Sequence, residues 1–205
     1  MPRPTASGTT GRVAGMGALE DGEMVEVTDA AAWRAWLDQN HRTSKGAWLV
    51  RARPGSTVEV IGYEDAILQA LCFGWIDGPV RSFDEERGGL WFAPRRATSG
   101  WAATNKARLI QLEEAGLITE AGYRAVEVAK ANGAWTVLDN AEALREPDDL
   151  AEALDAVPAA RTAWDGFPPS TRKLGISNVD LARRPETRAA RVAKIVADAA
   201  EGKRP

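Results

Sequence analysis

The residues best able to do chemistry lie close together, in the stretch 71–108. This stretch holds three of the eight tryptophans and a run of Arg, Ser, Asn and Lys side chains without an acid after Glu86. Large amphipathic rings beside fixed cations are typical of a binding pocket, although a small core has the same composition. The candidate ligand-binding residues are Trp75, Asp77, Trp91, Arg95, Arg96, Ser99, Trp101, Asn105 and Lys106.

The basic part of this stretch is the best candidate for an anion site. Arg95 and Arg96 follow the end of a predicted strand, and Ser99 is a suitable N-cap for the helix expected next. The free N–H groups and the positive dipole end of a helix N-terminus attract anions. With Asn105 and Lys106 little more than a turn further on, the pattern predicts a site for a carboxylate or phosphate. The alternative is an ordinary capped helix with solvated basic side chains.

Three other side chains could take part in a reaction. Asp77 could act as a general base, but an aspartate before Gly-Pro is also a common turn residue or a salt-bridge partner, here for Arg95 or Arg96. His41, the only imidazole, could exchange protons near neutral pH, or it could bond the terminal carbonyls of its helix. Cys72 lies on an apolar helix face, so we expect it to be buried and inert.

The sequence lacks the patterns that identify common enzymes. It has no Ser-His-Asp set, no phosphate-binding glycine loop and no dinucleotide fingerprint. One histidine and one cysteine cannot supply the usual four ligands of a zinc site. We therefore assign no catalytic residues, no metal ligands and no cofactor, and we expect a protein that is not an enzyme. An enzyme that uses Asp77 or His41 is the alternative.

Charge divides the C-terminal part of the chain. Residues 139–155 contain seven acids and one base, whereas residues 171–205 contain nine bases and four acids. Arg184, Arg188 and Arg191, spaced by four and three, share one side of the last predicted helix. They could pair with the acidic segment, follow a nucleic-acid backbone or contact a protein partner. The net charge of −3 gives the whole molecule no general attraction to nucleic acid.

Composition indicates a soluble globular protein, with 44% hydrophobic and 27% charged residues among 205. The first 23 residues contain no apolar run of the kind that a secretory signal needs, and they predict a disordered tail. No window approaches the ~18 apolar residues of a membrane span. A cytoplasmic location is therefore expected.

Periodicity predicts an α+β protein, with a small antiparallel sheet in the N-terminal half packed with helices and an all-helical C-terminal part. Short strands are expected near residues 25–27 and 58–61, a longer strand at 47–53, and a hairpin from 80–83 and 90–94. Helices are expected to begin near residues 29, 63, 99, 119, 148, 159 and 185. The predicted division is a tail at 1–23, an α+β domain at 24–136 and a helical region at 137–205.

Several long segments carry a family resemblance: WLDQNH, GAWLV, YEDAILQALCFGWIDG, FAPRRATSGWAATNKAR, LITEAGYRAVEVAKANGAW, DDLAEAL and RRPETRAARV. Together they resemble the YdeI/OmpD-associated family, also called bacteriocin-protection proteins, over about residues 25–202. The segment LGISNVDLARRPETR departs from the version with more tryptophan that is usual in relatives.

The resemblance implies a bacterial stress or antimicrobial-resistance protein, and it carries over no catalytic residues. The predicted function is the binding of a small anionic molecule or peptide in a cleft lined by Trp75, Trp91 and Trp101, with Arg95 and Lys106 holding the anion. The alternative is a nucleic-acid-associated regulator that uses its basic C-terminal helix.

Overall fold

The computed structural model describes residue 19 and residues 22–205, so most of the predicted tail lies outside the described residues. The chain divides into two compact units, Met1–Pro94 and Arg95–Pro205. The boundary predicted from the sequence, between residues 136 and 137, falls inside the second of these units and stays a prediction. The two units are described separately below.

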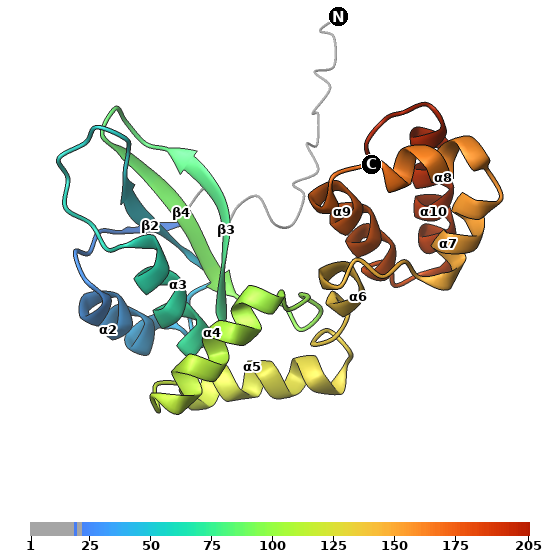
Figure 1. Ribbon diagram of the computed structural model, residues 1–205. Coiled ribbons are helices and arrows are strands. Elements are labelled where there is room, and N and C mark those ends of the chain that lie inside the picture. The colour runs from blue at the N-terminus through green and yellow to red at the C-terminus, as the bar shows by residue number, and fades with distance from the viewer. Residues whose placement is uncertain (1–18, 20–21) are drawn as a thin grey trace, which may run out of the picture. The chain divides into compact units, whose positions relative to one another are not determined.

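The first unit is built on a four-stranded sheet (Figure 1). Its strands are β1 (Glu23–Val25), β2 (Ala47–Ala52), β3 (Trp75–Ser82) and β4 (Arg87–Pro94), in the order β1-β2-β4-β3. β4 pairs antiparallel with both β2 and β3, while the short β1 runs parallel to β2. The α+β class with a mainly antiparallel sheet is thus confirmed.

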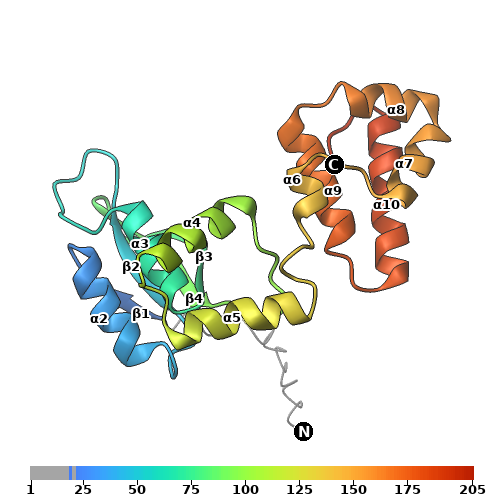
Figure 2. The same ribbon diagram turned by 60° about the horizontal axis from the view of Figure 1, so that its bottom comes forward.

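Two helices pack on one face of this sheet. α2 (Ala30–Asn40) begins where the Asp29 carboxylate accepts a hydrogen bond from the Ala32 N–H, and α3 (Tyr63–Cys72) lies beside it (Figure 2). The Trp33 ring packs on Phe92 of β4 at 5.5 Å between ring centroids, and its indole N–H donates to the carbonyl of Ala66. These contacts define the helix-covered face of the sheet.

Two details of the predicted strands are wrong. The first strand lies two residues earlier than predicted, at Glu23–Val25. Residues 58–61 form no strand, because the Ile61 N–H donates to the Val27 carbonyl outside any ladder and the Val58 N–H donates to the Ser56 hydroxyl.

The second unit, all of whose residues are described, is helical throughout. It contains α4 (Ala103–Glu114), α5 (Glu120–Ala131), α6 (Asp139–Glu142), α7 (Asp148–Asp155), α8 (Pro158–Asp165), α9 (Pro169–Asp180) and α10 (Pro185–Ala200). Leu150, Leu154, Trp164, Ile176 and Ile195 are among the buried residues that join α7, α8, α9 and α10 in one core. The predicted helical C-terminal part is confirmed.

The predicted start of α4 at Ser99 is wrong. The helix begins at Ala103, and its N-cap, Ala102, has no side chain that can cap it. Trp101 explains why the helix begins later than predicted, because its main-chain N–H donates to the carbonyl of Ala134 and its ring is buried against Trp135. The chain between Pro94 and Ala103, which includes a turn at residues 97–98, therefore becomes helical only after this ring.

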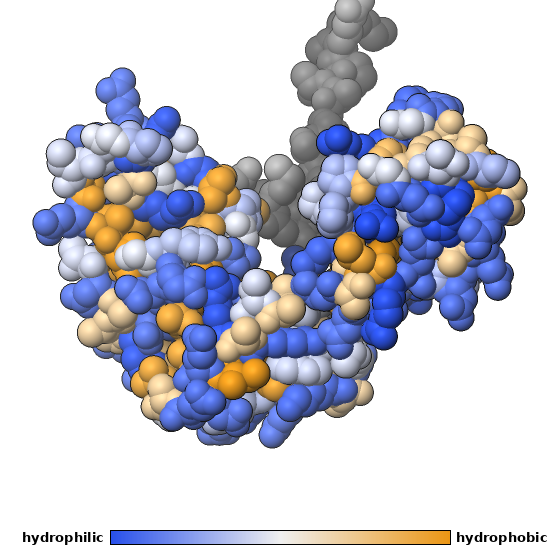
Figure 3. Space-filling view, in the orientation of Figure 1, coloured by the Kyte–Doolittle hydropathy of each residue, from blue (hydrophilic) through white to orange (hydrophobic). Residues whose placement is uncertain are grey.

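Among the described residues, no helix is both long and apolar enough to cross a membrane. The face of the molecule in Figure 3 shows apolar side chains reaching the surface at separate places, with polar residues between them.

Candidate functional site

The three tryptophans predicted to line a cleft are buried. The exposed fractions of Trp75, Trp91 and Trp101 are 1%, 7% and 1%. Each ring lies 5.2–5.9 Å from the ring of another tryptophan, between centroids. The structure therefore agrees with the reading of these rings as parts of the core. Their contact with a ligand stays a prediction.

Arg95 contacts its own segment. Its guanidinium carbon lies 3.8 Å from the centre of the Trp101 ring, and its Nη2 donates to the Gly100 carbonyl at 2.7 Å. A guanidinium stacked at this distance on a buried indole is held firmly by cation–π attraction. Arg95 thus fixes the turn before α4, whereas Arg96 is exposed.

The N-terminus of α4 already holds an anion, and that anion belongs to the protein. The Ala103 N–H donates to the Glu142 carboxylate at 3.2 Å, and Lys106 pairs with Asp139 at 2.5 Å. Both acids lie on α6. A hydrogen bond from Lys173, with a smaller contribution from the Ala103 N–H, holds the pKa of Glu142 below its usual value. The N-terminus of α4 therefore binds anions as predicted, and the anions are the carboxylates of Glu142 and Asp139 on α6.

Asn105 and Asp77 of the predicted site also have partners within their own units. The Asn105 amide oxygen accepts from Arg108 at 2.9 Å. Asp77 lies within β3, just before a register shift, and its carboxylate accepts from the Tyr63 hydroxyl at 3.3 Å. Roles of Asn105 and Asp77 in ligand binding stay predictions.

The two other candidates for acid–base or thiol chemistry have structural contacts. The Nδ1 of His41 lies 2.9 Å from the Leu37 carbonyl, which is the helix-end contact that the sequence allowed, and its ring lies 5.0 Å from Phe73. Cys72 is fully buried, and this burial raises the pKa of its thiol. A buried thiol of raised pKa is not a reactive nucleophile.

Of the three arginines on one side of α10, Arg184, Arg188 and Arg191, which we call the basic stripe, Arg188 pairs with acids. Two nitrogens of Arg188 donate to the Asp149 carboxylate, at 2.6 and 2.8 Å, and a third lies 3.4 Å from Asp180. Arg191 donates to a main-chain carbonyl of α9, and Arg184 is exposed at the start of α10. Contacts of the stripe with nucleic acid or with a protein partner stay predictions.

The sequence reasoning missed an aromatic layer on the sheet. Neighbouring residues of a strand point to opposite faces, so Trp91 lies on the face opposite Phe92 and away from α2. There it pairs with Trp48 across the ladder, with ring centroids 5.2 Å apart, and Phe83 lies 6.1 Å from Trp48. We call Trp48, Phe83, Trp91 and the adjacent Arg81 the aromatic face.

Two glycines allow the rings of Trp91 and Phe83 to pack directly against the backbone. A Cβ added at Gly46 would lie 2.1 Å from a ring carbon of Trp91, and one at Gly89 would lie 2.5 Å from the Phe83 ring. The sequence signal for this packing was the glycines just before AWLV and LWF, since glycine in or beside a strand often marks a close approach.

Two hollows of opposite charge lie near the β3–β4 turn. One, of about 330 Å³, is lined by Arg51, Ala52, Arg53, Pro54, Val80, Arg81, Ser82, Gly88 and Gly89. Within the described part of the chain its lining holds no carboxylate. We call it the arginine hollow.

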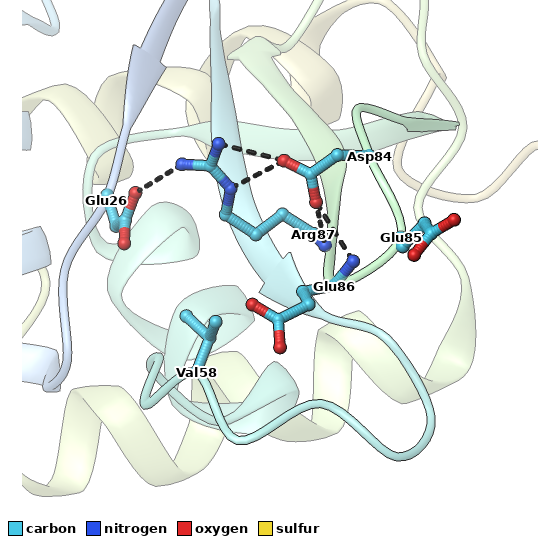
Figure 4. Close-up of a pocket in the computed structure, with 6 residues that line it drawn as sticks. All are labelled: Glu26, Val58, Asp84, Glu85, Glu86 and Arg87. Carbon is cyan, nitrogen blue, oxygen red and sulfur yellow. Dashed lines mark hydrogen bonds and ion pairs between the residues drawn. The ribbon is translucent and has the colours of Figure 1, made fainter.

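The other hollow, of about 500 Å³, is lined by Glu26, Val58, Asp84, Glu85, Glu86 and Arg87 (Figure 4). Arg87 bridges Asp84 and Glu26 there, at 2.8 and 3.3 Å. The main-chain N–H of Arg87 is the largest cause that holds the pKa of Asp84 below its usual value.

Comparison with known families divides the chain in two. Residues 25–125 match the model of a domain of unknown function, DUF8412, and these residues include the aromatic face and the arginine hollow. Residues 143–202 match the model described as "Bacteriocin-protection, YdeI or OmpD-Associated". No curated protein and no solved structure matches the chain. The resemblance expected over residues 25–202 is thus confirmed for residues 143–202, which are similar to the bacteriocin-protection, YdeI or OmpD-associated family.

Proposed function

We propose that this protein is a non-enzymatic binding protein that acts in protection against bacteriocins or related antimicrobial stress. The family match of residues 143–202 supports the protective role. The arginine hollow supports a binding role, because it gathers cations at a concave surface without a carboxylate in its lining. The bound group is an anion of a small molecule or of a peptide.

The arginines of this hollow keep donors for a ligand. Arg53 donates one nitrogen to the main-chain carbonyl of Asp84 at 2.8 Å, and a guanidinium has five N–H donors in all. Arg51 is exposed, with its guanidinium carbon 5.8 Å from the centre of the Tyr63 ring. Guanidinium groups bind carboxylates and phosphates with paired hydrogen bonds, which suits a site for either anion.

The contrast with Lys106 identifies the better anion site. Lys106 is mostly buried and faces Asp139 at 2.5 Å, so an external anion must first displace an internal one. Arg51 and Arg53 face no such competitor within the lining of their hollow. We therefore place the anion at the arginine hollow and keep the originally predicted site, Arg95 to Lys106, as the second location to test.

Calorimetric titration with inorganic phosphate, citrate and an acidic peptide tests this proposal. We expect the double variant Arg51→Gln/Arg53→Gln to bind at least ten-fold more weakly than the wild type. Arg42→Gln, an exposed arginine of the same unit outside the hollow, should leave binding unchanged. Loss of binding in Lys106→Gln and not in the double variant would move the site to α4, and absence of binding to every probe would refute the proposal.

A cellular assay tests the protective role separately. Cells that express the double variant should be as sensitive to a panel of bacteriocins as cells without the protein, whereas Arg42→Gln cells should be as tolerant as wild type. Equal tolerance of all strains would remove the protective role while leaving anion binding intact.

A further inference from the structure

The turn between β3 and β4 carries negative charge that the protein does not pair. Asp84, Glu85 and Glu86 are all exposed there. Asp84 has an internal partner, since Arg87 pairs with it at 2.8 Å. Within the described residues the carboxylates of Glu85 and Glu86 form no ion pair, and Figure 4 shows both outside the bonds that join Arg87 to Asp84 and Glu26. We call Glu85 and Glu86 the acidic tip.

The arginine hollow lies directly beside the acidic tip. The main-chain N–H of Arg53 donates to the Glu86 carbonyl at 2.8 Å, and its Nη1 donates to the Asp84 carbonyl at 2.8 Å. Arg51 lies opposite Gly88 in the ladder of β2 and β4. Arg53 thus contacts the turn through main-chain oxygens, and in the described part of the chain neither arginine of the hollow pairs with a carboxylate. Opposite charges therefore lie side by side without pairing.

Neighbouring patches of opposite charge suit a two-fold symmetric pair of molecules. In such a dimer the same surface of both copies meets, so that residue i of one copy contacts residue j of the other and j contacts i. A two-fold axis that passes between the tip and the hollow brings each acidic tip to the arginine hollow of the other copy. A surface with charge of one sign would instead repel its own copy.

The hollow suits a carboxylate side chain. Its volume of about 330 Å³ is at the lower end for ligand pockets, which favours a small acidic group over a large organic molecule. Guanidinium groups bind carboxylates with paired hydrogen bonds. Val80 in the lining is 63% exposed, and contact with a second molecule would remove this apolar surface from water.

We propose that the protein forms a two-fold symmetric dimer in which Glu85 and Glu86 of each copy occupy the arginine hollow of the other. Such a dimer deepens the proposed function, because it rests on the binding of carboxylates at Arg51 and Arg53 and makes a second copy of this chain their partner. External anions and the acidic tip then compete for the same guanidiniums. Exposed ion pairs are individually weak and are screened by salt, so the dimer is transient and dissociates as ionic strength rises.

Reversing the charges on each side tests the dimer. Analytical ultracentrifugation of the full-length protein at low salt should show association of the wild type. This association should weaken at least ten-fold in Glu85→Lys/Glu86→Lys and in Arg51→Glu/Arg53→Glu. An equimolar mixture of the two variants should associate again, because each tip then faces a hollow of opposite charge. Recovery in the mixture also shows that both variants are folded.

The matched control is Glu113→Lys/Glu114→Lys, which makes the same change in net charge at two exposed acids of α4. It should associate as the wild type does. A wild type that stays monomeric at low salt, a mixture that stays monomeric, or a control that loses association to the same extent would overturn the dimer.

Phosphate binding separates the dimer from the anion site itself. The neutral variant Glu85→Gln/Glu86→Gln keeps Arg51 and Arg53, so it should be monomeric and bind inorganic phosphate at least as tightly as the wild type. Phosphate should dissociate the wild-type dimer more than sodium chloride does at equal ionic strength. Unchanged association of the neutral variant would overturn the dimer and leave the anion site in place. Absence of phosphate binding, together with association of the charge-reversed mixture, would refute the small-anion site and keep the dimer.

Discussion

At the scale of single residues, Glu146 accepts three side-chain hydrogen bonds within the helical unit. Its carboxylate receives two nitrogens of Arg161, at 3.1 and 2.9 Å, and the indole N–H of Trp164 at 2.7 Å. Burial raises the pKa of Glu146, but the hydrogen bonds from Arg161 and Trp164 outweigh it and hold the pKa below its usual value. The Glu146 hydrogen bond is also the largest cause that raises the pKa of Arg161. This carboxylate therefore connects the segment before α7 to α8.

Replacing Glu146 by Gln should destabilise the protein by about 2 kcal/mol. The side chains of Arg161 and Glu146 are only 23% and 18% exposed, and removing one partner of a largely buried pair leaves the other charge poorly compensated. The estimate is below the range for fully buried pairs because Arg161 keeps Asp155 and Asp165 as partners. Urea unfolding measures the change. Glu120→Gln, which breaks a pair with side chains 70–80% exposed, should cost less than about 0.5 kcal/mol, and equal costs would contradict the argument.

Replacing Gly46 by Ala should cost roughly 3 kcal/mol or more. Its φ of 143° is unfavourable for any side chain, and the added Cβ would lie 2.1 Å from Trp91, in a packed layer that cannot absorb a methyl group. Gly55 has a φ of 86° and no atom within 4 Å of the added Cβ. Gly55→Ala should therefore show only the backbone strain, about 1–2 kcal/mol. Thermal unfolding with near-ultraviolet circular dichroism measures both variants, and a cost of Gly46→Ala no larger than that of Gly55→Ala would refute the packing of Trp91 on this glycine.

At the scale of elements, the sequence predicted the helices and strands whose ends are determined by local interactions. α2 begins directly after Asp29, β2 lies within the strand predicted at residues 47–53, and α10 begins at Pro185, as expected. The start of α4 was mispredicted because burial of Trp101 is a tertiary effect that outweighs the capping propensity of Ser99.

Local sequence patterns also could not show that the N-terminus of α4 binds carboxylates of the protein itself, because this too is a tertiary effect. The sequence identifies cations before and within α4, but the acids that neutralise them lie more than thirty residues later, on α6. A helix of four residues has little intrinsic pattern, so α6 was not predicted. The aromatic face depends on the register between β2 and β4, which alternation alone does not determine.

Removing the α6 carboxylate should loosen the first turn of α4. In Glu142→Gln the charge that faces the Ala103 N–H and Lys173 is lost, and with it a favourable contact with the helix dipole, worth about 0.3–1 kcal/mol. Amide hydrogen exchange should become several-fold faster at residues 103–106 and stay unchanged in α10.

The exposed pair of Glu201 and Lys203 offers the control. Glu201→Gln should leave exchange in α4 as in the wild type. Unchanged exchange in Glu142→Gln would mean that the contact with α6 does not order this helix end.

At the scale of the whole molecule, the arrangement of charge matters more than the net value of −3. In the second unit, Glu142, Glu146 and Asp149 each receive a Lys or Arg, and the pKa of each is below its usual value. In the first unit, the arginine hollow has no carboxylate in its described lining. These three carboxylates thus stabilise the helical unit, whereas the cations of the arginine hollow have no carboxylate beside them in its lining.

This arrangement predicts that acid destabilises the protein through the helical unit. A carboxyl whose pKa is lower in the folded than in the unfolded state contributes stability that is complete above the unfolded value, here near 4.5 for Glu and 3.8 for Asp. That contribution is lost as pH falls through the lowered folded values. The melting temperature should therefore change little between pH 7 and about pH 5 and then fall steeply toward pH 3.

The triple variant Glu142→Gln/Glu146→Gln/Asp149→Asn separates these groups from the other acids. It should be less stable than wild type at pH 7 and should lose less stability between pH 5 and pH 3, because its three side chains no longer take up protons. Glu120→Gln serves as the control, since its exposed pair should leave the pH profile unchanged. A triple variant whose profile runs parallel to that of the wild type would show that acid acts through other carboxylates.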